Sequence, residues 1–205
     1  MPASNNTKVR TRRTQEERST ETQDKIIRGA AKCIVEPGYK AATMKGIAEA
    51  AGVTWGAIQH DFGDKENISH GVTELGAMEF KARTQRISLD SMSLSKRVDA
   101  FLEQAREQTE DELYRASIVI FRNKTQQVPM GNFSVMKETL RDIWLAIFGD
   151  IKVKIGRKRF NDIKDFTYMS VNAIAVDRMS FEKGERHDRS HFKLLGEFLI
   201  RPLNK

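Results

Sequence analysis

Side chains able to recognise another molecule gather within residues 43–65, where the sequence reads TMKGIAEAAGVTWGAIQHDFGDK. Helical spacing predicts two short helices here, joined by a tight turn. The second helix turns its two large apolar residues inward, which leaves Trp55, Gly56, Gln59 and His60 toward solvent. A two-turn helix with small, aromatic and amide groups on its outer side suits the major groove of DNA, which is about 12 Å wide and admits a helix.

The outer side of the second helix is positioned by the capping residues of both helices and by the apolar residues that hold them in the core. Thr43 and Thr54 are expected N-caps of the two helices. Gly52 lies where the first helix would end in a left-handed residue, because glycine has no Cβ to penalise a positive φ. Spacing alone leaves the function open, since any small helical domain can contain a helix, a glycine and a second helix. The residues expected to face inward are Met44, Ile47, Ala48, Ala51, Val53, Ile58 and Phe62.

The pattern T-x-x-x-I-A-x-x-A-G-V-[ST]-x-G-x-[IL]-x-x-x-F-x-x-K in this stretch resembles the helix-turn-helix of the TetR family of bacterial transcriptional regulators. Upstream, Gly38 and Tyr39 match the Gly-aromatic pair that usually precedes the motif. The close resemblance covers about residues 22–70, and beyond it only the length and the all-helical pattern agree. The matching residues are Thr43, Ile47, Ala48, Ala51, Gly52, Val53, Thr54, Gly56, Ile58, Phe62 and Lys65.

The resemblance implies a fold, a set of partners and a mechanism. Members of this family are homodimers with a three-helix DNA-binding head on an all-α regulatory body, and two heads address half-sites of a pseudo-palindromic operator in successive major grooves. A small molecule in the body shifts the separation of the heads and lowers affinity for the operator. The implied protein is therefore a cytoplasmic repressor that binds double-stranded operator DNA, a second copy of itself and an unknown small-molecule effector, with no cofactor and no membrane.

Two departures from the family pattern fall on the second helix. Gln59 stands where the family usually has a tyrosine that contacts phosphate, so it would contact phosphate more weakly or read adenine. Asp61 would repel phosphate, and it is expected to point away from DNA or to pair with Lys65 or Lys45. Trp55 either contacts a thymine methyl or sugar, or packs on the surface of the head. The expected DNA contacts are Thr43, Lys45, Thr54, Trp55, Gly56, Gln59, His60 and Lys65.

Residues 1–20 contain almost nothing apolar, so a flexible basic arm is expected there. One interpretation is a solvated, solubilising terminus. The other is an arm that follows DNA phosphates or enters the minor groove beside the recognition helix, because it adjoins the helix-turn-helix. In that case Arg10, Arg12 and Arg13 join the DNA contacts.

The rest of the chain predicts helices only, which gives an all-α fold: a three-helix helix-turn-helix DNA-binding head and an all-helical ligand-binding and dimerisation body. We expect the head at residues 21–66, with the helix-turn-helix at 43–62, and the body at 67–205. Ser95 is an expected cap, residues 150–159 an expected solvated loop, and Pro202 the expected end of the last helix. The remaining predicted helices cover about residues 22–35, 65–86, 112–124, 134–149, 160–181 and 188–201.

The predicted helix 160–181 is apolar around most of its circumference, so it needs a second packing partner, which a second copy of the chain would supply. The expected dimer contacts are Phe166, Met169, Ile174, Phe192, Leu195, Phe198 and Leu199. A pocket between body helices would suit a small ligand. The candidate ligand contacts, each as easily a core residue, are Phe121, Met136, Trp144, Phe166 and Asn172.

The sequence shows no constellation of residues that suggests an enzyme. His187 and His191 have the spacing of zinc ligands, but no nearby Cys or Glu completes a site, so a solvated or capping role is expected and no metal is predicted. The single Cys33 is expected to be a small core residue. The net charge of +7 agrees with a polyanionic partner, and no apolar run approaches the roughly 18 residues of a membrane span. The rival interpretation is a helical enzyme or small-molecule-binding protein with an incidental head, which would carry a polar triad in the body.

Overall fold

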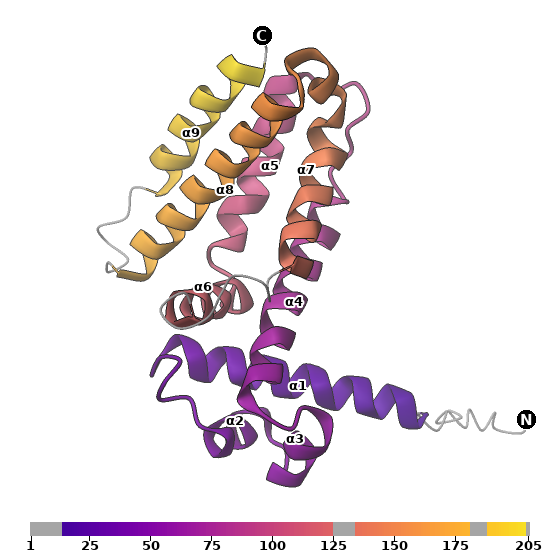
Figure 1. Cartoon of the computed structure of the whole chain (residues 1–205), viewed down its shortest axis with the longest axis vertical. Helices are drawn as coiled ribbons and strands as arrows, with labels where there is room; N and C mark the ends of the chain where they lie inside the picture. The colour runs from indigo at the N-terminus through magenta and orange to yellow at the C-terminus, as the bar shows by residue number, and fades with distance from the viewer. Residues whose placement is uncertain (1–13, 125–133, 181–187, 204–205) are drawn as a thin grey trace, which may run out of the picture.

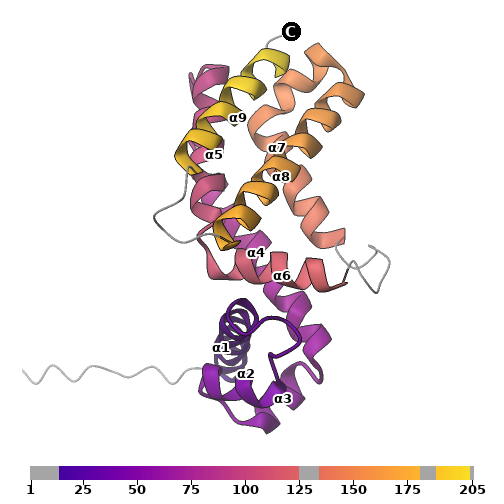
Figure 2. The same ribbon diagram turned by 90° about the vertical axis from the view of Figure 1, so that its left-hand side faces the viewer.

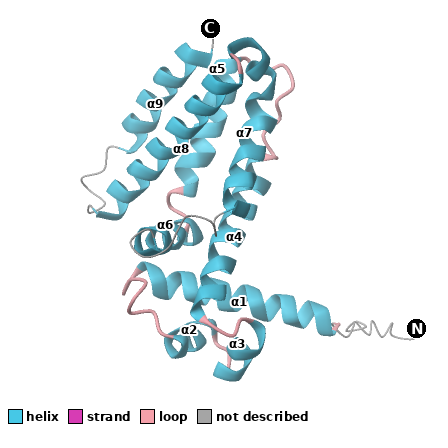
Figure 3. Ribbon diagram, viewed as in Figure 1, coloured by secondary structure: helices cyan, strands magenta, loops and turns pink. Residues whose placement is uncertain are grey.

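The computed structural model describes residues 14–124, 134–180 and 188–203. Within these ranges every regular element is a helix, which confirms the all-α fold class (Figure 3). The helices are α1 (Gln15–Val35), α2 (Met44–Ala51), α3 (Trp55–Asp61), α4 (Lys65–Thr84), α5 (Leu94–Gln108), α6 (Glu112–Lys124), α7 (Ser134–Ile155), α8 (Arg157–Ser180) and α9 (Asp188–Leu203).

The helices form a small head at one end of an elongated molecule and a bundle at the other. Helices α1, α2 and α3 make the head, and α5, α7, α8 and α9 make the bundle (Figure 1). Helix α4 runs from the head into the body, and α6 lies across the molecule between the two parts (Figure 2). Because α6 contacts both α1 and α4, it joins the body to the head directly.

The core of the head is shared with α4 and α6. Ile47 and Ile58, from α2 and α3, are fully buried. Ile68 of α4 and Ile120 of α6 are buried in the same cluster. The apolar packing of the head therefore continues beyond residue 66, and α6 is one of the walls of the head.

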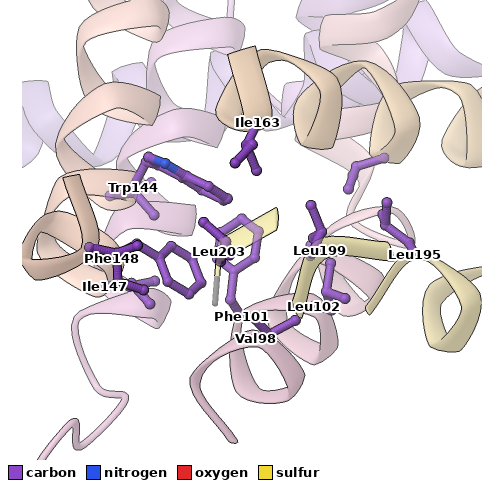
Figure 4. Close-up of a cluster of buried hydrophobic side chains, with 14 of the residues drawn as sticks. Val98, Phe101, Leu102, Trp144, Ile147, Phe148, Ile163, Leu195, Leu199 and Leu203 are labelled. Atoms are coloured by element: carbon purple, nitrogen blue, oxygen red, sulfur yellow. The ribbon is translucent and has the colours of Figure 1, made fainter. Parts of the chain in front are cut away.

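The core of the body centres on aromatic rings from two helices. Phe101 of α5 meets Trp144 and Phe148 of α7 with ring centroids 5.6 and 5.8 Å away, both in edge-on geometry. Leu195 and Leu199 of α9 close the cluster from the opposite side (Figure 4). Edge-on aromatic pairs contribute beyond their buried area, so this cluster fixes α5 against α7.

Two helices begin at other residues than the sequence predicts. Helix α1 begins at Gln15, so the prediction of a flexible arm is wrong for the residues after Thr14. The Thr14 hydroxyl accepts the Glu17 N–H at 3.2 Å, and the Glu17 carboxylate accepts the Thr14 N–H at 2.8 Å. This capping box satisfies two N–H groups that a helix end otherwise leaves without partners. Helix α5 is capped by Ser93 instead of Ser95, because the Ser93 hydroxyl accepts the Lys96 N–H.

Two helices end later than predicted. Helix α7 continues to Ile155, because Ile151 is buried in the body core, and it stops at Gly156, where φ is +80°. Helix α8 begins directly after it at Arg157, so the prediction of a loop at 150–159 is wrong. Helix α9 includes Pro202 and ends at Leu203. Proline removes only one helical N–H at this last turn, so it does not stop the helix before it. None of the described helices has the length and apolarity that crossing a membrane requires.

Candidate nucleic-acid interface

The turn between α2 and α3 is built by two threonine caps and one left-handed glycine. The Thr43 hydroxyl accepts the Gly46 N–H at 3.1 Å, and the Thr54 hydroxyl accepts the Ala57 N–H at 3.2 Å. Gly52 has φ +64°, a conformation that side chains with a Cβ rarely adopt. The predicted caps and the predicted left-handed residue are confirmed, and together they fix the angle at which α3 leaves α2.

Helix α3 buries one face and presents the other to solvent. Ile58 is fully buried, whereas Trp55 is 57% exposed and the His60 side chain is 86% exposed. Gly56 and Gln59 are exposed as well. These four residues, Trp55, Gly56, Gln59 and His60, form what we call the outer face of α3. It lies at the end of the molecule away from the body, where no described part of the chain covers it (Figure 1).

Three further predicted contacts border this face. Lys45 is exposed on α2, and Thr43 and Thr54 are exposed at the two caps. Each threonine oxygen already accepts a helix N–H, but a hydroxyl keeps its own proton to donate. Both threonines can therefore cap a helix and donate to a phosphate oxygen at the same time. Contact of these residues with DNA remains a prediction.

Lys65 points back into the head, which differs from the simple phosphate contact expected of it. Its ammonium donates to the Tyr39 carbonyl oxygen and lies 4.2 Å from the centroid of the Tyr39 ring. Burial lowers the pKa of Lys65. Ser69, one turn later on α4, donates to the Tyr39 hydroxyl at 3.4 Å. Lys65 thus ties the start of α4 to the segment between α1 and α2, a role that the sequence pattern did not indicate.

Of the two alternatives predicted for Asp61, pointing away from DNA or pairing with a lysine, only the lysine pairing is wrong, because Asp61 contacts His60 instead. Its carboxylate contacts His60 Nδ1 at 2.8 Å, and its side chain is only 9% exposed. The two residues are adjacent at the end of α3, where the helix turns the carboxylate inward beside the imidazole. Arg10, Arg12 and Arg13, the expected arm contacts, lie outside the described residues.

The body contains a cavity of about 1060 Å³ bounded by residues of five helices, α4 to α8. Phe121 and Asn172 line it, as the ligand prediction requires. Trp144 does not belong to the lining, because it is fully buried in the aromatic core. Phe166 is 53% exposed on the outer side of α8, so it is not a ligand contact either. The side chain of Met136 lies outside the part of the chain that the structure describes.

Two tyrosines of the cavity wall already have hydrogen-bond partners. Tyr114 donates to Asn172 Oδ1 at 2.5 Å, and Tyr168 donates to the Leu140 carbonyl oxygen at 2.7 Å. Burial raises the pKa of both hydroxyls, so both remain neutral near neutral pH. Their protons are directed at protein acceptors. The wall is thus held together by its own polar groups.

The residues expected at a dimer interface divide into two groups. Phe166, Met169 and Phe198 are 53–70% exposed, and Ile174 is half-buried. Phe192, Leu195 and Leu199 are no more than 6% exposed because they pack into the core of their own chain, so their assignment to a dimer interface is corrected. Leu194, four positions before Phe198 on α9, is 51% exposed.

The remaining chemical candidates have packing or surface positions. Cys33 is partly buried, and its thiol donates to the Gly46 carbonyl oxygen at 3.5 Å. His191 is exposed on α9, and His187 lies outside the described residues. Across the described ranges, no group of three or more His, Cys, Asp or Glu side chains could hold a metal ion.

Comparison with known proteins places the head in a family. Residues 26–71 match the family model described as bacterial regulatory proteins, tetR family. The chain is 44% identical over 52 residues to the HTH-type transcriptional repressor AcnR of Corynebacterium glutamicum, a match to 25% of this chain and 28% of that protein. It is 38% identical over 68 residues to AcnR of Corynebacterium diphtheriae, which are 33% of this chain and 30% of that protein. The chain thus matches less than a third of the length of these curated relatives.

Solved structures extend the likeness to the body. A transcriptional regulator from Rhodococcus sp. Rha1 has a TM-score of 0.71 at 14% identity, covering 87% of this chain and 96% of that chain. The fatty acid degradation regulator FadR from Bacillus halodurans has a TM-score of 0.68 at 17% identity, covering 87% and 94%. At such identities the likeness establishes a shared fold. The head of the chain, from α1 into α4, therefore matches the TetR family of bacterial regulatory proteins, and the solved structures share the fold of head and body.

Proposed function

We propose that this chain is a cytoplasmic, ligand-responsive transcriptional repressor that binds pseudo-palindromic operator DNA as a homodimer. The observation that carries the proposal is the outer face of α3. It is exposed at the end of the molecule, while Ile58 anchors the opposite side of the same helix in the core. A helix presented in this way can enter a major groove with its side chains on base edges.

The residue types on that face suit base and phosphate contacts. The Gln59 amide can donate to and accept from an adenine edge, and the exposed Trp55 ring offers a flat apolar surface to a thymine methyl group. Gly56 has no side chain to hold the backbone away from DNA. His60, on the face itself, and Lys45, exposed on α2, carry groups able to meet phosphate oxygens.

Dimerisation is supported by exposed apolar side chains on two neighbouring helices. Phe166 and Met169 of α8 and Leu194 and Phe198 of α9 are each more than half exposed. Helices α8 and α9 lie side by side in the body (Figure 2), so we group these four residues together. We call them the α8–α9 patch. A second copy related by a two-fold axis would cover the patch and place two α3 helices on one duplex.

Release by a small molecule is supported by the way α4 and α6 serve both parts of the protein. Phe80 of α4 and Ile118 of α6 line the cavity, while Val72 of α4 and Ile120 of α6 are buried in the core of the head. A ligand that moves α6 would therefore move a wall of the head. Such coupling requires that the ligand binds one arrangement of α6 more tightly than the other.

The test is selection of DNA from a random-sequence pool by the full chain, followed by mobility-shift titrations at rising salt. Gln59→Ala is expected to change which sequences bind, because it removes a base-reading amide. Lys45→Ala is expected to weaken binding to all sequences alike and to reduce the slope of log affinity against log salt by about 1. Lys193→Ala, at an exposed position on α9, is the control and should leave the selected sequences and the salt dependence unchanged.

The outcomes separate the proposal from its rival. If no DNA is enriched, or if binding does not weaken as salt rises, the head does not bind DNA. The rival function, a helical enzyme or small-molecule-binding protein with an incidental head, is then favoured. If Gln59→Ala and Lys45→Ala reduce binding equally on every sequence, Gln59 does not read bases. Lys65→Ala is a less specific probe of phosphate contact, because it also removes the tie to Tyr39.

A further inference from the structure

We infer that the body cavity takes an amphipathic carboxylate, which is a ligand with one anionic head group on an extended apolar body. The inference rests on the proposed ligand-responsive function and specifies the chemistry of its effector. It is drawn from two independent features of the lining: the apolar character of the cavity interior and the excess of positive charge among its charged residues.

The interior of the cavity is mostly aromatic and aliphatic. Phe80, Phe101 and Phe121 come from three different helices, and Ile118, Val171 and Val176 join them. The polar groups among them are largely occupied, since the Tyr114 and Tyr168 hydroxyls donate to Asn172 and Leu140. Gln108 is 2% exposed, and its Nε2 donates to the Gly76 carbonyl oxygen at 3.5 Å, while its Oε1 has no hydrogen-bond partner among the described residues. A ligand that fills this space meets few available polar groups, so its body must be apolar.

The charged residues of the lining are unbalanced. Among the described lining residues, Arg122, Lys137, Arg141 and Lys164 are cationic, and Asp165 is the one carboxylate. Asp165 lies 3.1 Å from the Lys164 ammonium, so its charge is matched within the lining. The lining itself therefore holds more cationic than anionic side chains. An anionic group is favoured in such a site, and a cationic one is repelled.

Three of the cations come from the end of α6 and the start of α7. Arg122 lies in the last turn of α6, and Lys137 and Arg141 lie in the first two turns of α7. The end of α6 and the start of α7 are on the same side of the body (Figure 2). Arg141 also lies 3.2 Å from Asp142, which leaves further N–H groups of its guanidinium able to donate. A carboxylate placed here keeps charged partners, while its apolar body extends between α5 and α8.

The direct test uses three probes with the same twelve-carbon chain, titrated below micelle formation into the full chain and followed by calorimetry. Dodecanoate supplies the carboxylate, methyl dodecanoate is neutral and dodecylamine is cationic. We expect dodecanoate to bind roughly tenfold or more tightly than either of the others, as a charge-assisted hydrogen bond would give. Decanoate is expected to bind roughly tenfold or more weakly than dodecanoate, because each buried methylene contributes about fourfold.

A pair of charge-matched double variants locates the anion site. Lys137→Gln with Arg141→Gln should remove most of the preference for dodecanoate over its methyl ester. Lys154→Gln with Lys193→Gln changes the net charge equally at exposed positions that are not part of the lining, and it should keep the preference. Equal loss in both double variants would mean that the preference follows overall charge and would overturn the site. Thermal unfolding of each variant checks that the fold is retained.

Failure of this inference is distinguishable from failure of the proposed function. If the chain enriches DNA in the selection experiment, but dodecylamine or the ester binds as tightly as dodecanoate, or none of the probes binds, the ligand class is overturned and the regulator remains. If dodecanoate binds with the expected preference but no DNA is enriched, the ligand class holds and the regulatory function is overturned.

Discussion

The contact between α1 and α2 gives a sharp prediction, because it is made through a glycine. A Cβ added at Gly29 would lie 2.8 Å from the Ala51 backbone nitrogen and 2.9 Å from the Ala51 Cα and Cβ. These atoms cannot rotate away, so Gly29→Ala must push α1 and α2 apart. Overpacking of this kind costs about 1–3 kcal/mol, and the better helix propensity of alanine returns about 0.8–1 kcal/mol. We expect a net loss of about 1 kcal/mol in the free energy of unfolding, from a range of about 0–2 kcal/mol.

The same substitution elsewhere in the chain is the matched control. Gly149 lies inside α7, and an added Cβ would have no neighbouring atom within 4 Å beyond the helix's own backbone. Only helix propensity acts there, so Gly149→Ala should raise the free energy of unfolding by about 0.5–1 kcal/mol. The two variants make an identical change of covalent structure and are expected to shift stability in opposite directions.

Urea unfolding followed by far-ultraviolet circular dichroism measures both effects. The chain concentration must be the same for all variants, because association makes apparent stability depend on concentration. A stability of Gly29→Ala equal to or above that of the parent chain would show that α1 and α2 are not packed this closely. A loss of stability in Gly149→Ala would show that α7 is not regular at this position. Gly29→Ala is also expected to weaken DNA binding, because α2 carries the turn that orients α3.

Two further predictions concern the α8–α9 patch and a surface ion pair. Phe198→Arg should convert a dimer to a monomer, as measured by sedimentation equilibrium. Met78→Arg, at an exposed position on α4, is the control and should leave the dimer intact. If both variants remain dimers, the α8–α9 patch is not the interface. Hydrogen bonds from Arg97 at 2.7 and 3.0 Å lower the pKa of Asp150. The ion pair therefore stabilises the fold fully at pH values above the usual carboxyl pKa of about 4, and this stabilisation is lost as the pH falls through the lowered pKa of Asp150. Because Asp150 is 57% exposed, Asp150→Asn should cost less than about 1 kcal/mol near neutral pH and nothing in strong acid, measured by urea unfolding; a deficit that persisted in acid would contradict this reasoning.

Local chemistry determined the head of this protein. The Thr43 and Thr54 caps, the left-handed Gly52 and the buried Ile58 all follow from rules that act within one or two helical turns, and the structure confirms each of them. Thr14 and Glu17 have the spacing of a capping box, so the same local rules could have predicted the early start of α1 from the sequence. The sequence by itself therefore determined the helices of the head and the side of α3 that faces solvent.

Tertiary packing decided which apolar residues of the body face its core and which face outward. Leu195 and Phe198 have similar hydrophobicity on one helix, yet the first is buried against α5 and the second is exposed. The sequence could not separate them, because apolar residues lie on more than one side of α8 and α9 and periodicity alone does not say which side packs inward. The ties from Lys65 to Tyr39 and from Tyr114 to Asn172 join residues 26 and 58 positions apart. No local rule encodes such pairs, so only the folded chain could place them, together with the cavity that the aromatic and cationic residues enclose.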